Sequence, residues 1–149
     1  MKLECQGGFL ISKVHHISGR IFSRMLDEHD VDINPAQGRI MFVLWQQDGL
    51  PIRELAKRTA LGKSTLTSML DRLESAGLIV RERSASDRRV LLVRRTEKDR
   101  SRQRTYEQVS REMTQIYYDH LTDDEIRGFE ETLERILRNL IEHEEGRAA

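Results

Sequence analysis

Residues 51–96 decide the fold, and they read PIRELAKRTALGKSTLTSMLDRLESAGLIVRERSASDRRVLLVRRT. Apolar residues at helical spacing predict two short helices here, one over residues 52–59 and one from Lys63 to about Ala76. A break at residues 60–62 separates them, and Gly77, which readily takes a positive φ, ends the second. The segment is therefore expected to form a helix-turn-helix.

An arginine-rich hairpin follows these two helices. Residues 78–83 and 90–94 have the composition of strands, and the sequence SASDRR at residues 84–89 joins them. A hairpin in this position is called a wing. We therefore expect a winged helix-turn-helix domain over residues 34–96.

The second predicted helix has an apolar face and a polar face, since side chains advance by about 100° per residue around a helix. The apolar face consists of Leu66, Met69, Leu70 and Leu73. The polar face and its shoulders consist of Ser64, Thr65, Thr67, Ser68, Asp71, Arg72 and Ser75. Because most of these polar side chains are short, another molecule can approach this face closely.

The chain is neutral overall, with 25 basic and 25 acidic side chains in 149 residues, but its charge is unevenly distributed. Residues 50–95 hold eleven Lys or Arg against five acids, a net charge of +6. Residues 121–149 hold four Arg against nine acids, a net charge of −5. The local field decides where a polyanion binds, so the winged segment is the part expected to attract nucleic acid.

Long amphipathic helices are predicted on both sides of the winged segment. One covers about residues 8–29, and Asn34 and Pro35 begin another that continues to about residue 47. After the wing, a helix starts near Thr96, and a break at residues 121–125 precedes a last helix. Packing against a second copy of the chain would bury their apolar stripes. We therefore expect a mainly α fold with a small β-wing and about six helices, in which residues 1–30 and 97–149 form the dimerisation framework of a homodimer.

Several function classes have no signal in the sequence. The chain has no P-loop and no GxSxG motif, so we expect a protein that is not an enzyme and needs no cofactor. Its five histidines show no metal-ligand spacing, so no metal site is expected. A single cysteine, no signal sequence and no apolar run of roughly 18–20 residues predict a soluble, cytoplasmic protein with no membrane contact.

Several motifs, taken in their order and spacing, resemble the MarR family of bacterial and archaeal transcriptional regulators. The resemblance runs from about Phe9 to Leu140, and it is carried by residues 55–56, 66–74, 77–79 and 87–89 together with RRTEK at residues 94–98. Asp99 departs from the family, which often has Gly after Thr-Glu-Lys, and we expect this departure to alter only the start of the fifth helix. The resemblance implies a sequence-specific DNA-binding regulator, a repressor that binds a pseudo-palindromic operator as a homodimer.

The resemblance places the second helix of the helix-turn-helix in the major groove of DNA. At the wing tip it implies that Asp87 fixes the geometry of Arg89, which enters the minor groove. The residues implied to contact double-stranded DNA are Arg53, Lys63, Ser64, Thr65, Thr67, Ser68, Arg72, Asp87, Arg88 and Arg89. The alternatives are a wing tip that is only a solvated turn and, for the whole chain, a winged-helix protein-interaction module without DNA binding.

MarR-like proteins commonly release DNA when a small aromatic acid or another ligand binds, so the resemblance also implies a site for a small aromatic or anionic effector. The candidate ligand-binding residues are His15, His16, Arg20 and Trp45. Adjacent helical residues point about 100° apart, so the two histidines are not expected to face one pocket easily. The alternative places one histidine at the dimer interface, the other in solvent, and Trp45 in the core. Cys5 is a redox candidate by the same resemblance, but it lies beside Glu4 and has no partner cysteine in the same chain.

Overall fold

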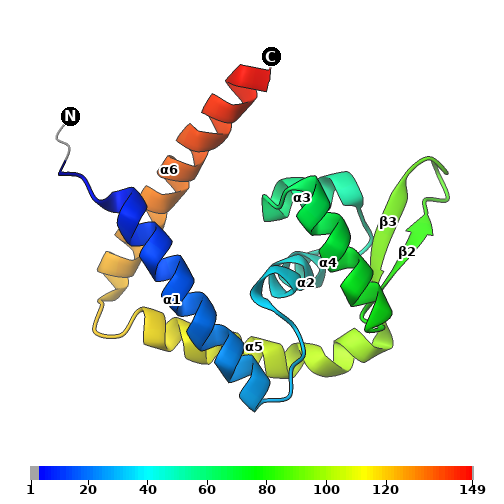
Figure 1. Ribbon diagram of the computed structural model, residues 1–149, viewed down its shortest axis with the longest axis horizontal. Helices are drawn as coiled ribbons and strands as arrows, with labels where there is room; N and C mark the ends of the chain where they lie inside the picture. Colours follow the sequence, from blue (N-terminus) through cyan, green and yellow to red (C-terminus); the bar gives the residue numbers. More distant parts are fainter. Residues whose placement is uncertain (1–3, 149) are drawn as a thin grey trace. The chain divides into compact units, whose positions relative to one another are not determined.

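The computed structural model describes the backbone of residues 4–148 and the side chains of residues 4–147. The chain divides into two compact units, Met1–Met113 and Thr114–Ala149, which are considered separately. Six helices and three short strands lie in the described part (Figure 1), and the expected mainly α fold with a small wing is confirmed. None of the helices among these residues is both long and apolar enough to cross a bilayer.

The first unit contains the winged helix-turn-helix and the helices next to it in sequence. Its elements are α1 (Gly7–Glu28), α2 (Pro35–Gln46), β1 (Leu50–Pro51), α3 (Ile52–Thr59), α4 (Lys63–Ser75), β2 (Ile79–Arg83), β3 (Leu91–Arg95) and most of α5 (Glu97–Tyr117). The two helices of the helix-turn-helix begin and end within one residue of the predicted positions. Between them, Ala60 takes the left-handed conformation with φ 57° and turns the chain.

The sheet has one strand more than the sequence analysis predicted. Its order is β1-β3-β2, all antiparallel, with Leu50 opposite Val93 and Ile79 opposite Arg95. Strand β1 is only two residues long and lacks any alternating pattern, which is why the sequence did not reveal it. Pro51 has no N–H to donate, and its position on an edge strand is the one that a sheet tolerates.

The apolar face of α4 forms part of the core of the first unit. Leu66, Leu70 and Leu73 are at most 2% exposed, and Met69 packs against them from a half-buried position. They share this core with buried residues from α1, α2, α3, the sheet and α5. As predicted, Gly77 has a positive φ of 78° just after the helix.

Helix α2 begins as the sequence predicts. The Asn34 side chain accepts from the backbone N–H of Gln37 at 2.8 Å, and the Gln37 side chain accepts from the backbone N–H of Asn34 at 2.9 Å. This reciprocal capping box satisfies N–H groups that a helix start otherwise leaves without partners. Pro35 occupies the first helical position, where its fixed φ fits the helix.

The second unit holds the end of α5 and helix α6 (Asp123–Ala148). His120, with φ 65°, lies in the turn between them. Thr122 and Glu125 form a capping box at the predicted break, with hydrogen bonds of 3.2 and 3.1 Å. Across the turn, the Tyr118 hydroxyl donates to Glu130 at 2.8 Å.

Asp99 does not act only at the start of α5, so the expectation for this residue was wrong. Its side chain is 1% exposed, because α5 turns it into the core beside Trp45 and Arg95. Asp99 lies near the start of a helix in the sequence, and nothing in that position indicates that its side chain is buried.

Tyr106 joins α1, α2 and α5 inside the first unit. Its ring packs edge-on against Trp45 at 4.9 Å and against Phe22 at 5.6 Å between ring centroids. Burial raises the pKa of Tyr106 to about 12. The hydroxyl lies against the backbone of Gly38, where a Cβ atom would come within 1.9 Å of the Tyr106 oxygen. Helix α2 therefore needs a glycine at this position.

We predict that Gly38→Ala destabilises the protein by about 1–3 kcal/mol, the usual cost of overpacking a core. The measurement is chemical denaturation followed by circular dichroism. The matched control is Gly128→Ala in α6, where an added Cβ meets nothing within 4 Å. This control should be neutral or stabilising by up to about 1 kcal/mol, since alanine is the better helix former. Equal stability of Gly38→Ala and the wild type would contradict the Tyr106 packing.

Candidate nucleic-acid interface

The solvent-facing side of α4 carries hydroxyl groups that are free for contacts. Ser64, Thr65, Thr67 and Ser68 are all exposed. The Thr67 hydroxyl donates to the carbonyl oxygen of Lys63 at 2.9 Å, one turn earlier. Within residues 4–148, the hydroxyls of Ser64, Thr65 and Ser68 form no hydrogen bond to the protein. These three groups can therefore donate to, or accept from, an outside molecule.

A shallow hollow runs along this side of α4. Its lining residues are Lys63, Ser64, Thr67, Ser68 and Asp71. The leucines of the same helix are buried on the opposite side, so the helix cannot rotate this surface inward without exposing its core face. Packing thus fixes which α4 side chains face solvent.

Arg81 on β2 pairs with the two acidic residues of α4. Its guanidinium lies 2.7 Å from an Asp71 oxygen and 3.1 Å from a Glu74 oxygen. The Arg81 backbone N–H also donates to Glu74 at 3.1 Å. The hydrogen bond from Arg81 holds the pKa of Glu74 below its usual range, so the Glu74 carboxylate remains ionised and paired at neutral pH. With Lys63 and Arg72, the three basic side chains outnumber the two acids, so this surface has a net charge of +1.

The pairing of Arg81 is not apparent from the sequence, in which this residue counts only as one more basic side chain. Two acidic residues three apart on α4 and an arginine on the next strand were the available signal. That signal becomes specific only when the register of β2 against α4 is known.

The wing tip holds one arginine extended in solvent. The Arg89 side chain is 91% exposed, and its Nε and Nη2 atoms donate to the two carboxylate oxygens of Asp87 at 3.1 and 3.2 Å. The Arg89 backbone N–H also donates to Asp87 at 3.1 Å. These bonds hold the pKa of Asp87 below its usual value. The pair is lost only as pH falls through that lowered pKa, so it is intact at neutral pH.

Hydrogen bonds within the hairpin fix the shape of the wing turn. The Arg83 guanidinium donates to the carbonyl oxygen of Arg88 at 2.8 Å, and the Val90 N–H donates to the Asp87 carbonyl at 3.0 Å. The Arg88 side chain is exposed. The turn therefore presents the two arginines of the tip with little freedom in the backbone beneath them.

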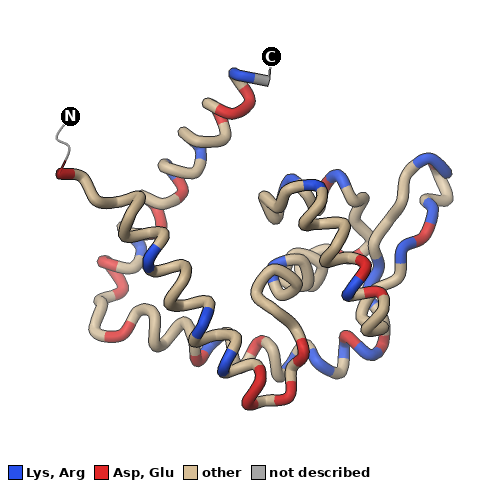
Figure 2. The backbone as a smooth tube through the Cα atoms, in the orientation of Figure 1, with Lys and Arg blue, Asp and Glu red and all other residues tan. Residues whose placement is uncertain are grey.

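The ten residues predicted to contact DNA lie on three consecutive parts of the first unit: α3, α4 and the wing. Arg53 is exposed on α3, whereas Arg58 on the same helix is paired with Glu54 at 3.1 Å. Nine of the ten are exposed, and only Asp87, under the Arg89 guanidinium, is half-buried. Figure 2 marks the basic residues of this segment along the backbone, including those at the wing tip.

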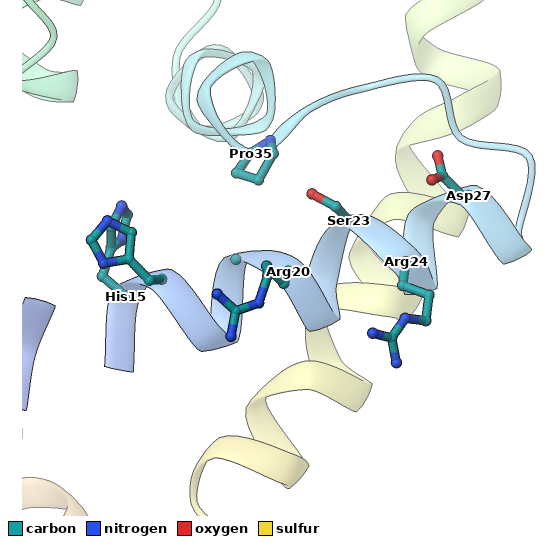
Figure 3. Close-up of a pocket in the computed structure, with 8 residues that line it drawn as sticks. His15, Arg20, Ser23, Arg24, Asp27 and Pro35 are labelled. Carbon is teal, nitrogen blue, oxygen red and sulfur yellow. The ribbon is translucent and has the colours of Figure 1, made fainter. Parts of the chain in front are cut away.

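A second hollow lies along α1, beside the start of α2 (Figure 3). Its lining residues are His15, His16, Gly19, Arg20, Ser23, Arg24, Asp27 and Pro35. The structure thus brings three of the four candidate ligand-binding residues together. Both histidines line it, contrary to the argument from helix geometry, because the hollow is open and wide enough for two neighbouring rings 5.8 Å apart.

Trp45, the fourth candidate, does not line this hollow. Its ring packs against Tyr106, and its indole N–H donates to both carboxylate oxygens of Asp99 at 3.2 Å. The side chain is half-buried and packs against the core. The structure therefore separates Trp45 from His15, His16 and Arg20.

The sequence is similar to a family model and to known transcriptional regulators. Residues 33–91 match the family model described as MarR family. The HTH-type transcriptional regulator TtmR of Methylorubrum extorquens (strain PA1) is 33% identical over 98 residues, which are 66% of this chain and 49% of that protein. The organic hydroperoxide resistance transcriptional regulator of Bacillus subtilis (strain 168) is 34% identical over 97 residues, 65% of each chain. The chain thus spans about half of the first relative and about two thirds of the second.

Among solved structures, the fold is similar to that of BpsR from Bordetella bronchiseptica, whose DNA binding is regulated by 6-hydroxynicotinic acid. The TM-score is 0.81 at 21% identity, and the match covers 91% of this chain and 96% of BpsR. At this identity the similarity concerns the fold.

Proposed function

We propose that the chain is a transcriptional regulator of the MarR family, which its residues 33–91 match, and that it binds double-stranded DNA through α4 and the wing. The observation that carries this proposal is the exposed surface of the winged segment. Free hydroxyls on α4 lie on the same unit as Arg89, which Asp87 holds extended at the wing tip. The segment also carries a net charge of +6.

Each part of this surface suits one feature of duplex DNA. A helix of the helix-turn-helix type enters the major groove, where short hydroxyls reach base edges and phosphates. Arg72 is placed one turn further along α4, where a guanidinium contacts phosphate or a guanine edge. Arg89 suits a narrow, electronegative minor groove. Because the Asp87 contact already orders the Arg89 side chain, less conformational entropy is lost on binding.

Pairing of the α4 acids also favours DNA binding. Unpaired, Asp71 and Glu74 would repel phosphates near the groove. Arg81 pairs with both carboxylates, and its charge together with those of Lys63 and Arg72 outweighs the two acids of α4. This arrangement supports a DNA-binding surface on a chain whose total charge is zero.

We propose a homodimer because apolar side chains remain exposed on helices of both units. On α1 these are Phe9, Leu10, Ile11, Val14 and Ile17, and on α6 they are Phe129, Ile136, Leu137, Leu140 and Ile141. Such faces are typical of an interface with another molecule. A symmetric dimer reads a pseudo-palindromic operator whose half-sites lie about 10 bp apart. In the cytoplasm, occupancy of such an operator would repress transcription.

We predict that Arg89→Ala weakens binding to duplex DNA from the upstream region of the protein's own gene by about 10-fold or more. The substitution removes the positive charge that is proposed to enter the minor groove. It does not disturb the core, because the Arg89 side chain is exposed. Fluorescence anisotropy at several salt concentrations measures the effect. The matched control, Arg127→Ala, removes the same charge from α6 and should leave the affinity within about 2-fold.

Thr65→Ala should change the preferred DNA sequence more than it changes the salt dependence of binding. The reason is that contacts to bases determine sequence specificity, whereas contacts to phosphates position the protein on the duplex.

Unchanged affinity of Arg89→Ala would show that the wing does not bind the minor groove. No binding by the wild-type dimer, even at low salt, would instead favour a winged-helix module that binds an acidic protein partner.

We further propose that the hollow on α1 binds a small anionic effector, such as an aromatic acid. Two arginines, Arg20 and Arg24, and two histidines, His15 and His16, line it against one acid, Asp27. Arginine forms paired hydrogen bonds with a carboxylate, which gives such a site both affinity and orientation. Trp45 is not part of this proposal, since it lies outside the hollow.

With 6-hydroxynicotinic acid as the probe, calorimetric titration should detect binding to the wild type, and Arg20→Ala should weaken it by about 10-fold, the usual effect of losing a charge-assisted hydrogen bond. Lys13→Ala is the matched control, because Lys13 is exposed on the same helix but does not line the hollow. Equal effects of the two substitutions would contradict the assignment of the hollow.

A further inference from the structure

A buried carboxylate lies at the start of α5. Asp99 is 1% exposed, and three N–H···O contacts reach its two oxygens. The Arg95 Nε atom donates to it at 2.6 Å, and the Trp45 indole N–H reaches both oxygens at 3.2 Å. The partners come from β3 and α2, so one side chain connects three elements of the first unit.

Arg95 extends these connections from the end of β3. Its guanidinium also donates to the Gln103 side chain, one further turn along α5. Its backbone N–H donates to the Asp48 carboxylate at 2.9 Å, and Asp48 also accepts from the Gly49 N–H at 2.8 Å in the turn after α2. The base of the wing is thus bonded both to α5 and to the turn that follows α2.

The same short segment also closes the end of α4. The Thr96 hydroxyl donates to the carbonyl oxygen of Gly77 at 2.6 Å, and the Lys98 ammonium donates to that of Ala76 at 2.7 Å. These bonds satisfy carbonyl groups that a helix end leaves without partners. Residues 95–99 therefore fix the wing and α4 to the same helix.

A buried ion pair is a weak source of stability, because removing two charges from water costs about as much as their attraction returns. Neutral side chains of similar size often give an equally stable protein. The pair is directional, however, and a bonded guanidinium and carboxylate allow few relative orientations. We therefore expect the Arg95–Asp99 pair to affect how α2, β3 and α5 are oriented relative to one another more than it affects stability.

We propose that Asp99 is a positioning residue for DNA binding, which holds Arg95 and thereby sets where the wing presents Arg89. This inference rests on the proposed DNA-binding function. Arg89 lies six residues before Arg95, a reach of roughly 20 Å along a strand at about 3.3 Å per residue. Over that length, a tilt of about 5° at the base moves the tip by about 2 Å. A small change at Asp99 is thus sufficient to move Arg89 out of the groove.

The test uses the whole 149-residue chain and two substitutions that remove the pair without leaving a lone buried charge. Arg95→Met with Asp99→Asn removes both charges, and the Asn carbonyl still accepts the Trp45 N–H. We expect a melting temperature equal to or above that of the wild type and DNA affinity about 10-fold lower. The matched control is Glu97→Gln with Arg100→Met, which removes the exposed pair of the same helical turn and should leave DNA affinity unchanged.

A double-mutant cycle with Arg89→Ala separates positioning from a merely structural role. If Asp99 acts through the wing, the paired substitution should cost little further affinity once Arg89 is absent. Additive losses, or unchanged affinity of the paired variant, would overturn the inference and leave the proposed function standing. A wild-type protein that does not bind duplex DNA would overturn the proposed function itself, and the positioning role with it.

Discussion

Burial of the leucine face of α4 is the constraint on which the rest of the site depends. Leu66, Leu70 and Leu73 enter the core of the first unit, and this fixes the rotation of the helix about its axis. Each buried leucine contributes roughly 1.5–3 kcal/mol, so any other rotation of α4 is strongly disfavoured. The hydroxyl groups of Ser64, Thr65 and Ser68 face solvent as a direct consequence.

Once α4 is oriented, the charges around it acquire distinct roles. Arg81 is used inside the protein, where it pairs with Asp71 and Glu74 and joins β2 to α4. Arg89 is used outside, at 91% exposure, and its only ion pair in residues 4–148 is with Asp87. Two arginines of one hairpin thus differ in partners and exposure, and a count of basic residues does not distinguish them.

Much of the fold follows from local patterns in the sequence. The start of α2 at Asn34, the end of α4 at Gly77 and the start of α6 after Thr122 all lie where the sequence predicts them. Each depends on residues within one or two turns of each other, so a local rule is sufficient.

The features that sequence did not reveal depend on distant contacts. Strand β1 exists because β3 offers it hydrogen-bond partners more than 40 residues later. Asp99 is buried because Trp45 and Arg95 meet it in the folded chain, and neither neighbour is visible in a helical pattern. In the same way, Trp45 is drawn into contact with Tyr106 and away from the hollow that His15, His16 and Arg20 share.

The central claim is that the exposed face of α4 and the wing read duplex DNA in a symmetric dimer. Selection of bound fragments from the source genome, followed by sequencing, tests this claim most directly. The account predicts enrichment of a pseudo-palindrome whose half-sites lie about 10 bp apart, one helical turn of DNA. Absence of enrichment, or enrichment of a single asymmetric half-site, would contradict it.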